Sequence, residues 1–286
     1  MKIRVAIIGT GNIGTDLLLK VLRTDFLDIV AFVGRRLDSE GIIIATKHNV
    51  TTSVEGIQYF LDNPKCCDIV YDCTSAADAT EHAKIFRQQG IKVIDLTPAK
   101  VGTMCIPDIN SDAILTEDNI NMITCGGQAS IPILHLVSKH SSKLEYIEIV
   151  SQIASKSAGM ATRINIDNYI ETTKKAITKF TGCDNTKVIL NLNPAQPCVD
   201  MQTTMFIEAK SINLKELAEE ITNKIEELKS YIPFYQLVLP PTINQAGVLV
   251  LSIKVKGAGD YLPEYAGNLD IINCAAIKAT QRLTQI

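Results

Sequence analysis

The sequence lacks several features that would place it in a specialised class. No apolar run approaches the roughly 18 residues that a membrane-spanning helix needs, and the first one stops at Gly9, too soon for a signal peptide. The 28 Lys and Arg residues are balanced by 31 Asp and Glu residues, so there is no basic excess for binding nucleic acid. We therefore expect a cytoplasmic protein that binds neither membranes nor nucleic acid.

No Cys-x-x-Cys pair occurs among the eight cysteines, and the four histidines lie near no cysteine pair. These absences argue against a zinc site, and the sequence predicts no metal ligands. Most of the cysteines fit free buried thiols. Cys125 does not fit that description, for reasons given below.

The length of 286 residues corresponds to about two domains of roughly 150 residues each. From residue 1 to about 130, short β-branched runs alternate with helix-like stretches. This pattern predicts an α/β domain of the doubly wound, Rossmann type, with a parallel sheet covered on both faces. The expected strands are 2–9, 29–34, 68–73, 92–96 and 120–124, and the expected helices include 12–23, 55–62 and 78–89.

After residue 143 the pattern changes to strands that alternate apolar and polar residues with period two, at 144–154, 201–209 and 248–256. Such strands predict a mostly antiparallel sheet in an α+β domain. Helices are expected at 163–180, at about 214–229 after a capping pair of Asn213 and Glu216, and at 270–284. We predict a dinucleotide-binding domain at 1–130, a catalytic and dimerisation domain at 131–269, and a C-terminal helix, 270–286, that returns to the first domain.

A glycine-rich turn, Gly9-Thr10-Gly11-Asn12-Ile13-Gly14, directly follows the first strand and opens a helix. Gly9 allows the tight turn, Gly11 allows close approach of a pyrophosphate, and Gly14 allows the helix to pack on the strand. The helix N-terminus offers N–H groups to the phosphates. This context predicts NAD or NADP binding.

The second strand ends in Val33-Gly34-Arg35-Arg36. The side chain at this point reads the adenosine ribose: a carboxylate accepts from the 2′-OH of NAD, whereas an arginine accommodates the 2′-phosphate of NADP. Arg35 and Arg36 therefore favour NADP. The alternative is that both are solvated surface charges.

Cys125 follows the strand at 120–124 and precedes two glycines and Ser130, the expected N-cap of an apolar helix. A thiol near a helix start lies in a positive field that lowers its pKa. The glycines let backbone N–H groups approach an oxyanion. Cys125 is thus predicted to be a nucleophile that forms a thiohemiacetal and then a thioester.

The chain resembles the acylating acetaldehyde dehydrogenases, which work beside a 4-hydroxy-2-oxoacid aldolase in aromatic catabolism. The resemblance covers nearly the full length and rests on six separated motifs. They are GTGNIGTDLL (9–18), DLTPAKVG (95–102), MITCGGQASIP (122–132), SKSAGMATRINIDNYIETT (155–173), NLNPAQP (191–197) and GAGDYLPEYAGNLDI (257–271).

The resemblance implies oxidation of a short aldehyde, such as acetaldehyde, with NAD(P) and CoA to acyl-CoA and reduced cofactor. It implies that Cys125 is the catalytic nucleophile, and it implies a homodimer that can dock on the aldolase. The residues that it implies for cofactor binding lie in three segments: Thr10, Gly11, Asn12 and Ile13; Ser155, Ser157, Ala158, Gly159 and Arg163; and Asn268.

Three departures from the family pattern matter. Arg36 replaces an acidic residue, and Met160 and Ala161 replace a Pro-Gly pair in the loop expected over the nicotinamide. Thr203 stands where the family usually carries an aspartate that assists the cysteine. Asp200 is near in sequence, but three residues along a strand place it on the opposite face unless a bulge intervenes.

Two other functions remain open from the sequence. A related semialdehyde or phosphorylating dehydrogenase would need an Arg and His pair near Cys125, and the nearest histidine, His135, fits a core position instead. A dinucleotide-binding subunit with impaired catalysis is the other alternative, and Thr203 is the feature that favours it.

Overall fold

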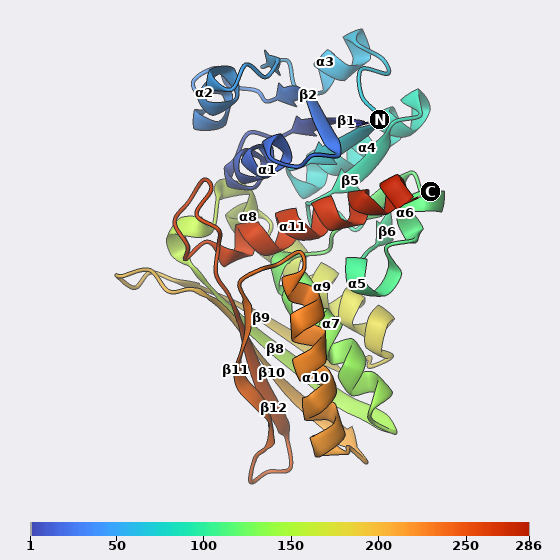
Figure 1. The fold of residues 1–286 in the computed structure, drawn as a ribbon, viewed down its shortest axis with the longest axis vertical. Coiled ribbons are helices and arrows are strands. Elements are labelled where there is room, and N and C mark those ends of the chain that lie inside the picture. The colour runs from blue at the N-terminus through green and yellow to red at the C-terminus, as the bar shows by residue number, and fades with distance from the viewer. Residues whose placement is uncertain (1, 286) are drawn as a thin grey trace.

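The first half of the chain forms a seven-stranded parallel sheet in the order β3-β2-β1-β4-β5-β7-β6. This computed structural model describes residues 2–285. The doubly wound, Rossmann-type sheet predicted from the sequence is confirmed (Figure 1). Its strands are β1 (Ile3–Ile8), β2 (Leu27–Val33), β3 (Thr52–Ser53), β4 (Ile69–Asp72), β5 (Lys92–Asp95), β6 (Thr103–Met104) and β7 (Asn119–Asn121).

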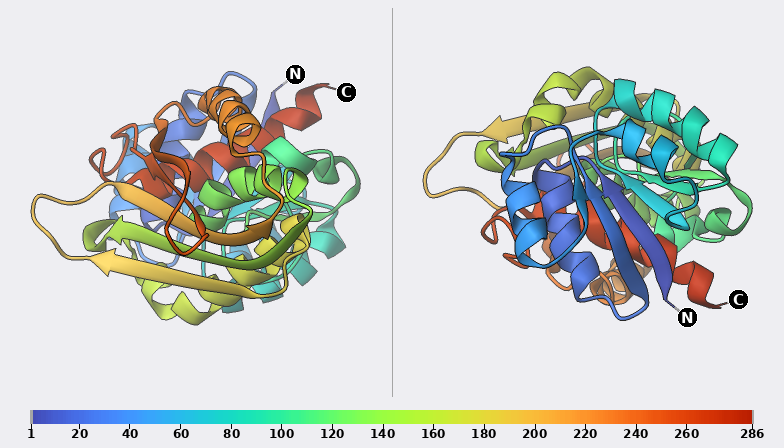
Figure 2. Two further views of the ribbon diagram at one scale, coloured as in Figure 1. Left: turned by 90° about the horizontal axis from the view of Figure 1, so that it is seen from below. Right: turned by 90° about the horizontal axis from the view of Figure 1, so that it is seen from above.

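Helices cover both faces of this sheet, and a separate apolar core lies against each face (Figure 2). The helices are α1 (Asn12–Leu22), α2 (Glu40–Lys47), α3 (Ile57–Asp62), α4 (Ala76–Gln89), α5 (Pro107–Asn110) and α6 (Ala113–Thr116). No helix in the described part of the chain has both the length and the apolar character needed to cross a membrane.

The second half forms a five-stranded sheet in the order β11-β12-β10-β8-β9. Every pair is antiparallel except β8 with β9, so the predicted mostly antiparallel sheet is confirmed. The strands are β8 (Lys143–Ala154), β9 (Thr186–Asn193), β10 (Met201–Lys210), β11 (Tyr235–Ile243) and β12 (Leu249–Val255).

Three helices, α7 (Cys125–Lys139), α9 (Ile166–Thr181) and α10 (Leu214–Lys229), pack against one face of this sheet in a single core. The backbone N–H of Glu216 donates to Asn213 at the start of α10, as the capping pair predicts. The helix predicted at 163–180 is instead two helices. The first, α8 (Met160–Ile164), ends before Asn165, and α9 begins after it, at Ile166.

The last long helix, α11 (Gly267–Gln281), lies between the two sheets (Figure 1). Ile272 and Ala276 belong to the core of the parallel sheet, whereas Ile271 belongs to the core of the second sheet. The Asn273 side chain donates to the carbonyl of Ile13 and to Asp16 on α1. The helix therefore joins both halves, while the domain boundaries near 130 and 270 stay a prediction.

A buried ion cluster holds α1, α11 and the loop before α11 together. The Lys20 ammonium, 2% exposed, lies 2.8 Å from Asp16, 2.7 Å from Asp260 and 3.1 Å from Asp270. Burial opposes the charge, but the surrounding carboxylates, Asp16 first, outweigh it and raise the pKa of Lys20 above its usual value. The buried Lys20 ammonium thus contacts three carboxylates, of which Asp260 is also paired with Arg23.

We expect the Lys20→Met variant to lose about 3–5 kcal/mol of the free energy of unfolding, because it leaves buried carboxylates without a counter-charge. Urea unfolding followed by circular dichroism measures this loss. Lys84→Met is the matched control, since Lys84 forms an exposed ion pair with Glu81 and its loss should leave the midpoint unchanged. Equal effects of the two substitutions would contradict the role given to Lys20.

Candidate functional site

A pocket of about 60 Å³ lies at the carboxyl ends of the parallel strands, where the two halves of the chain meet. Ligands of doubly wound sheets bind at this edge. The pocket is lined by residues of seven segments: Ile13; Cys73 and Thr74; Leu96, Thr97 and Pro98; Ile123, Thr124 and Cys125; Ile153; Ala161, Thr162, Asn165 and Tyr169; and Asn268 and Ile272. Among these lining residues there is no Arg, Lys, His, Asp or Glu.

The turn between β7 and α7 sets the position of Cys125. Ile123 in this turn has a φ of 65°, which is rare for a β-branched residue and marks local strain. The Asn121 side chain accepts from the Ile123 N–H at 2.9 Å and donates to Asp95 and to the carbonyl of Thr97, each at 2.9 Å. All these groups are buried, so the network fixes the strained turn.

Helix α7 begins at Cys125 itself, with Thr124 as its N-cap. The prediction that Ser130 caps this helix is wrong: its hydroxyl donates to the carbonyl of Gly126 inside the helix. The two glycines after Cys125 favour a loop in a prediction from sequence, but both lie inside the helix. They are instead required by space, since a Cβ at Gly126 would lie 2.2 Å from the Tyr169 hydroxyl.

The expected oxyanion donors are also occupied. The Gly126 N–H donates to the Tyr169 hydroxyl at 3.0 Å, and the Gly127 N–H donates to Thr124 Oγ1 at 3.0 Å. The two glycine N–H groups thus have partners within the protein, and the predicted approach of backbone N–H groups to an oxyanion stays a prediction. A side-chain hydroxyl satisfies each of them because both lie buried in the first turn of the helix.

The Cys125 thiol faces the pocket, and its Sγ lies 3.7 Å from the Tyr169 hydroxyl. Burial raises the pKa of the Cys125 thiol to about 11, while the Tyr169 hydroxyl and nearby backbone N–H groups lower it. The pKa of Cys125 is therefore raised and not lowered as predicted, because removal from water outweighs the hydrogen bonds to the thiol.

The glycine-rich turn has the shape that dinucleotide binding requires. Gly9 has a φ of 107°, and a Cβ there would lie 2.5 Å from the backbone of Cys73. A Cβ on Gly14 would lie 1.9 Å from the carbonyl of Gly9, so helix and strand pack closely. A Cβ on Gly11 would meet nothing within 4 Å, and this open space is available to a pyrophosphate.

The turn also contacts the other predicted cofactor segments. Thr10 Oγ1 accepts from Ser39, which lies beyond the ribose-reading turn, and Asn12 donates to the carbonyl of Ser157 at 3.3 Å. A Cβ on Gly159 would lie 3.6 Å from the Asn12 side chain. The structure thus brings Thr10, Asn12, Ser157 and Gly159 to one region, and Ile13 lines the pocket.

Arg163 is committed to the protein itself. Its guanidinium donates to the carbonyl of Ser155 at 2.7 Å, to the Ser155 hydroxyl at 2.8 Å and to the carbonyl of Ala158 at 3.1 Å. It therefore braces the segment that the resemblance places over the nicotinamide. A bound cofactor would contact this segment rather than the Arg163 guanidinium. The cofactor roles of Ser155, Ala158 and Arg163 stay predictions.

Two buried oxygen atoms in the pocket lack a hydrogen-bond partner among the described residues: Asn268 Oδ1 and Thr97 Oγ1. Buried polar atoms are normally paired, so such atoms fit a site completed by a polar ligand. Together with the open space at Gly11, they show that the residues present fit a nicotinamide dinucleotide.

Arg35 and Arg36 lie next to the glycine-rich turn but are exposed and paired. The Arg36 guanidinium makes two hydrogen bonds to Asp38, at 3.1 Å and 2.9 Å, and Arg35 lies 3.4 Å from Asp78. Because Gly34 packs against Thr10, both arginines are close to the turn expected to hold the adenosine ribose. Their pairing offsets part of the charge available to a 2′-phosphate.

Comparison with known proteins agrees with this geometry. The family described as "Prokaryotic acetaldehyde dehydrogenase, dimerisation" matches residues 125–263, and "Semialdehyde dehydrogenase, NAD binding domain" matches residues 4–117. An acetaldehyde dehydrogenase of Spirochaeta aurantia is 52% identical over 96% of this chain and 92% of its own length. One of Pectobacterium atrosepticum is 51% identical over 100% of this chain and 97% of its own.

This chain belongs to the acetaldehyde dehydrogenase family. The resemblance stated from the motifs is thereby confirmed, as is the prediction that the protein is an NAD(P)-dependent oxidoreductase. Aspartate semialdehyde dehydrogenase II of Vibrio cholerae shares the fold, with a TM-score of 0.67 over 100% of this chain and 99% of its own, at 14% identity.

The departures of this chain from the family pattern can now be placed. Thr203 is buried on β10, and its hydroxyl pairs with that of Ser151 at 2.9 Å. Asp200 lies 3.4 Å from Lys254 and does not line the pocket. The irregularity between β8 and β10 falls at Glu208, so no bulge turns Asp200 toward Cys125.

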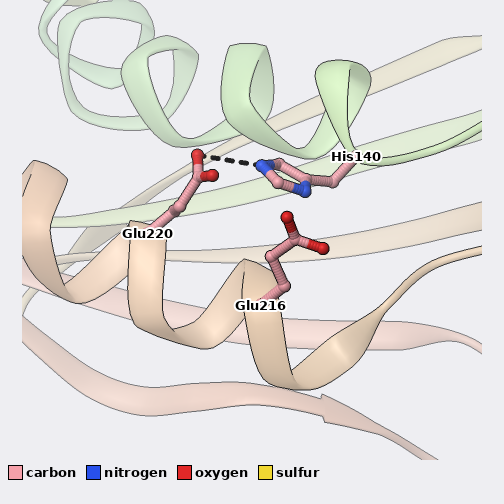
Figure 3. Close-up of side chains that lie close together, drawn as sticks. All are labelled: His140, Glu216 and Glu220. Atoms are coloured by element: carbon pink, nitrogen blue, oxygen red, sulfur yellow. Dashed lines mark ion pairs between the residues drawn. The ribbon is translucent and has the colours of Figure 1, made fainter.

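His135 bonds to the carbonyl of Phe180 at 2.8 Å and also lies outside the pocket lining. One group of potential metal ligands occurs elsewhere among the described residues: His140, Glu216 and Glu220, with ligand atoms within 4.8 Å (Figure 3). His140 Nε2 lies 2.9 Å from Glu220, which joins α7 to α10. Both glutamates are exposed, and the expected lack of a metal stays a prediction.

Tyr169 and Asn121 are site residues that the sequence analysis does not single out. Tyr169 lies inside the motif at 155–173, but no spacing rule ties a residue 44 positions away to Cys125. Asn121 reads as an ordinary strand residue. Its role follows from the positive φ of Ile123, which sequence patterns do not reveal.

We expect the Gly11→Val variant to lose most of its dinucleotide affinity, because the branched side chain fills the open space beside the turn. Fluorescence titration with NAD and NADP measures the affinity, and the thermal unfolding midpoint shows whether the fold is kept. Gly11→Ala, with one added methyl group, should weaken binding less. Unchanged affinity in a folded Val variant would contradict the placement of the pyrophosphate.

Proposed function

We propose that this protein oxidises a short aldehyde, such as acetaldehyde, with NAD(P) and transfers the acyl group to CoA. The observation that carries the proposal is the position of Cys125. It lies in a small pocket that also contains Ile13 of the glycine-rich turn and the unpaired oxygen of Asn268. The names of the relatives from Spirochaeta aurantia and Pectobacterium atrosepticum support the same activity.

The reaction would proceed in two parts on Cys125. The thiolate adds to the aldehyde carbonyl to form a thiohemiacetal, and loss of a hydride converts it into a thioester. Bound NAD(P) supplies the hydride acceptor. The thiol of CoA then attacks the thioester carbonyl, which releases acyl-CoA and frees Cys125. The apolar lining of Ile123, Ile153 and Ile272 limits the access of water that would hydrolyse the thioester.

The pocket favours an uncharged aldehyde. Its lining is mostly apolar and offers no cation to a carboxylate or a phosphate. A semialdehyde or phosphorylating dehydrogenase needs such a cation. This observation favours acetaldehyde over the substrates of the alternative dehydrogenases.

A homodimer formed through the second domain is part of this proposal, because the dimerisation family matches residues 125–263. On the part of β11 that the structure describes, Val238, Leu239 and Ile243 are between 39% and 48% exposed. This sheet offers apolar surface to a second copy. Docking on a 4-hydroxy-2-oxoacid aldolase stays a prediction, which co-purification of the two proteins would test.

We expect Cys125→Ser to lose more than about 95% of the turnover and to keep its affinity for NAD(P), because a hydroxyl is far less ionised than a thiol near neutral pH. NAD(P) reduction in the presence of acetaldehyde and CoA measures turnover. Cys66→Ser is the matched control, since Cys66 precedes the amino end of β4, away from the pocket. Substantial activity in the Cys125→Ser variant would exclude Cys125 as the nucleophile.

The same assay separates the alternative functions. Reduction that depends on acetaldehyde and CoA supports the proposal, whereas dependence on phosphate in place of CoA would indicate a phosphorylating dehydrogenase. Dinucleotide binding without turnover would indicate an impaired subunit, which Thr203 in place of an acidic residue allows.

We also propose a preference for NADP. Arg36 gains a charge-assisted contact with a 2′-phosphate, and its exposed pair with Asp38 is weak enough to exchange for that contact. We expect kcat/KM to favour NADP by about tenfold, Arg36→Asp to shift the preference toward NAD, and Asp38→Asn to increase it for NADP. Equal or better efficiency with NAD in the unmutated enzyme would mean that the arginines serve only as solvated charges.

A further inference from the structure

Three hydroxyl groups from separate elements converge on the first turn of α7. The Tyr169 hydroxyl, from α9, lies 3.7 Å from Cys125 Sγ and accepts from the Gly126 N–H at 3.0 Å. A Cβ built on Gly126 would lie 2.2 Å from this hydroxyl and 2.9 Å from that of Ser151 on β8. The Ser151 hydroxyl in turn pairs with Thr203 on β10 at 2.9 Å.

The number of protons available in this cluster determines which group donates each hydrogen bond. A tyrosine hydroxyl has one proton and can accept two hydrogen bonds. The Gly126 N–H donates to the Tyr169 oxygen at 3.0 Å, so this neighbour cannot take the proton of the tyrosine. Cys125 Sγ, 3.7 Å from the same oxygen, is in position to accept it, and the Ser151 hydroxyl lies beside the same turn of α7.

We propose that Tyr169 donates its O–H to Cys125 Sγ and thereby stabilises the thiolate, with Ser151 and Thr203 holding it in that orientation. The proposal rests on the proposed function for the role of Cys125 as nucleophile. Tyr169 is a catalytic residue in this reaction because it touches the reacting sulfur atom. Ser151 and Thr203 are positioning residues that act through it.

Tyr169 does not remove the proton from the thiol. Burial raises the pKa of Tyr169 well above its usual value, and the adjacent cysteine raises it further. In the proposed step, which precedes aldehyde binding, the S–H bond of the partly exposed Cys125 breaks and its proton passes to solvent, while Tyr169 keeps its own proton. This arrangement needs no carboxylate, and the pocket lining contains none.

Few other groups can influence the ionisation of Cys125. The lining residues come from the ends of three parallel strands, from β8 and from α1, α7, α8, α9 and α11, and the titratable side chains among them are Cys73, Cys125 and Tyr169. Burial and the nearby Asp72 and Asp95 raise the pKa of Cys73. Buried Asp95, whose pKa is raised to about 7, is bonded to Asn121 in the turn before Cys125. The difference in pH profile between the Tyr169 variant and the unmutated protein, which share Asp95, therefore reports on the contact of Cys125 with Tyr169.

The test is the rate of alkylation of Cys125 by iodoacetamide between about pH 7 and pH 12, a range that contains the raised pKa of this thiol, followed by mass spectrometry of the peptide that contains it. We expect Tyr169→Phe to move the pH midpoint upward by about one unit and to slow alkylation at about pH 8 by roughly five- to tenfold. We expect Ser151→Ala to shift the midpoint in the same direction by less, since Tyr169 then loses its orientation.

Tyr235→Phe is the matched control. Tyr235 is also buried and donates to the backbone of α7, at the carbonyl of Ala129, but it does not line the pocket. Loss of its hydroxyl should lower stability without moving the pH midpoint. An unchanged midpoint in Tyr169→Phe, or equal shifts in Tyr169→Phe and Tyr235→Phe, would overturn the proposal.

Alkylation requires neither NAD(P) nor an aldehyde. If the protein does not reduce NAD(P) with acetaldehyde, the proposed function fails, but the shift between the two tyrosine variants can still be measured. If turnover is found and the shift is absent, the proposed function stands and the role of Tyr169 fails.

Discussion

The strained turn between β7 and α7 is the constraint on which the site depends. It must change a buried parallel strand into a helix within a few residues, and Ile123 takes a left-handed conformation to do so. Such a conformation persists only where the surroundings over-determine it. The buried bonds from Asn121 to Ile123 and Asp95 supply that constraint. They tie the position of Cys125 to the core of the parallel sheet.

The second constraint is the junction between the two halves of the chain. Helix α11 contributes to both cores, and its first turn carries Asn268 into the pocket. The ion cluster around Lys20 fixes this helix on α1, the helix that follows the glycine-rich turn. A movement of α11 would therefore displace the predicted cofactor turn and the far wall of the pocket together. The site is a property of the junction rather than of either half.

Local patterns predict those parts of the molecule in which a short segment determines its own conformation. The glycine-rich turn and the Asn213 cap of α10 are of this kind. Edge strands are not determined by their own sequence in this way. Pro240 and Pro241 in β11 remove backbone donors and therefore argue against a strand, but β11 lies at the edge of its sheet, where such residues are tolerated. The environment of Cys125 is equally non-local, because its burial and its contact with Tyr169 arise only when α9 packs on α7.

The same reasoning explains how a nucleophile can work in an uncharged pocket. A carboxylate beside Cys125 would add a second negative charge next to a thiolate in a buried site, at a cost in desolvation. Hydroxyl groups stabilise that thiolate without adding charge, and backbone N–H groups hold their oxygen atoms in place. The family pattern alone suggests that Thr203 has lost the function of an aspartate. In the folded chain its hydroxyl pairs with that of Ser151. The residue at this position then serves to orient a donor toward the sulfur rather than to accept its proton.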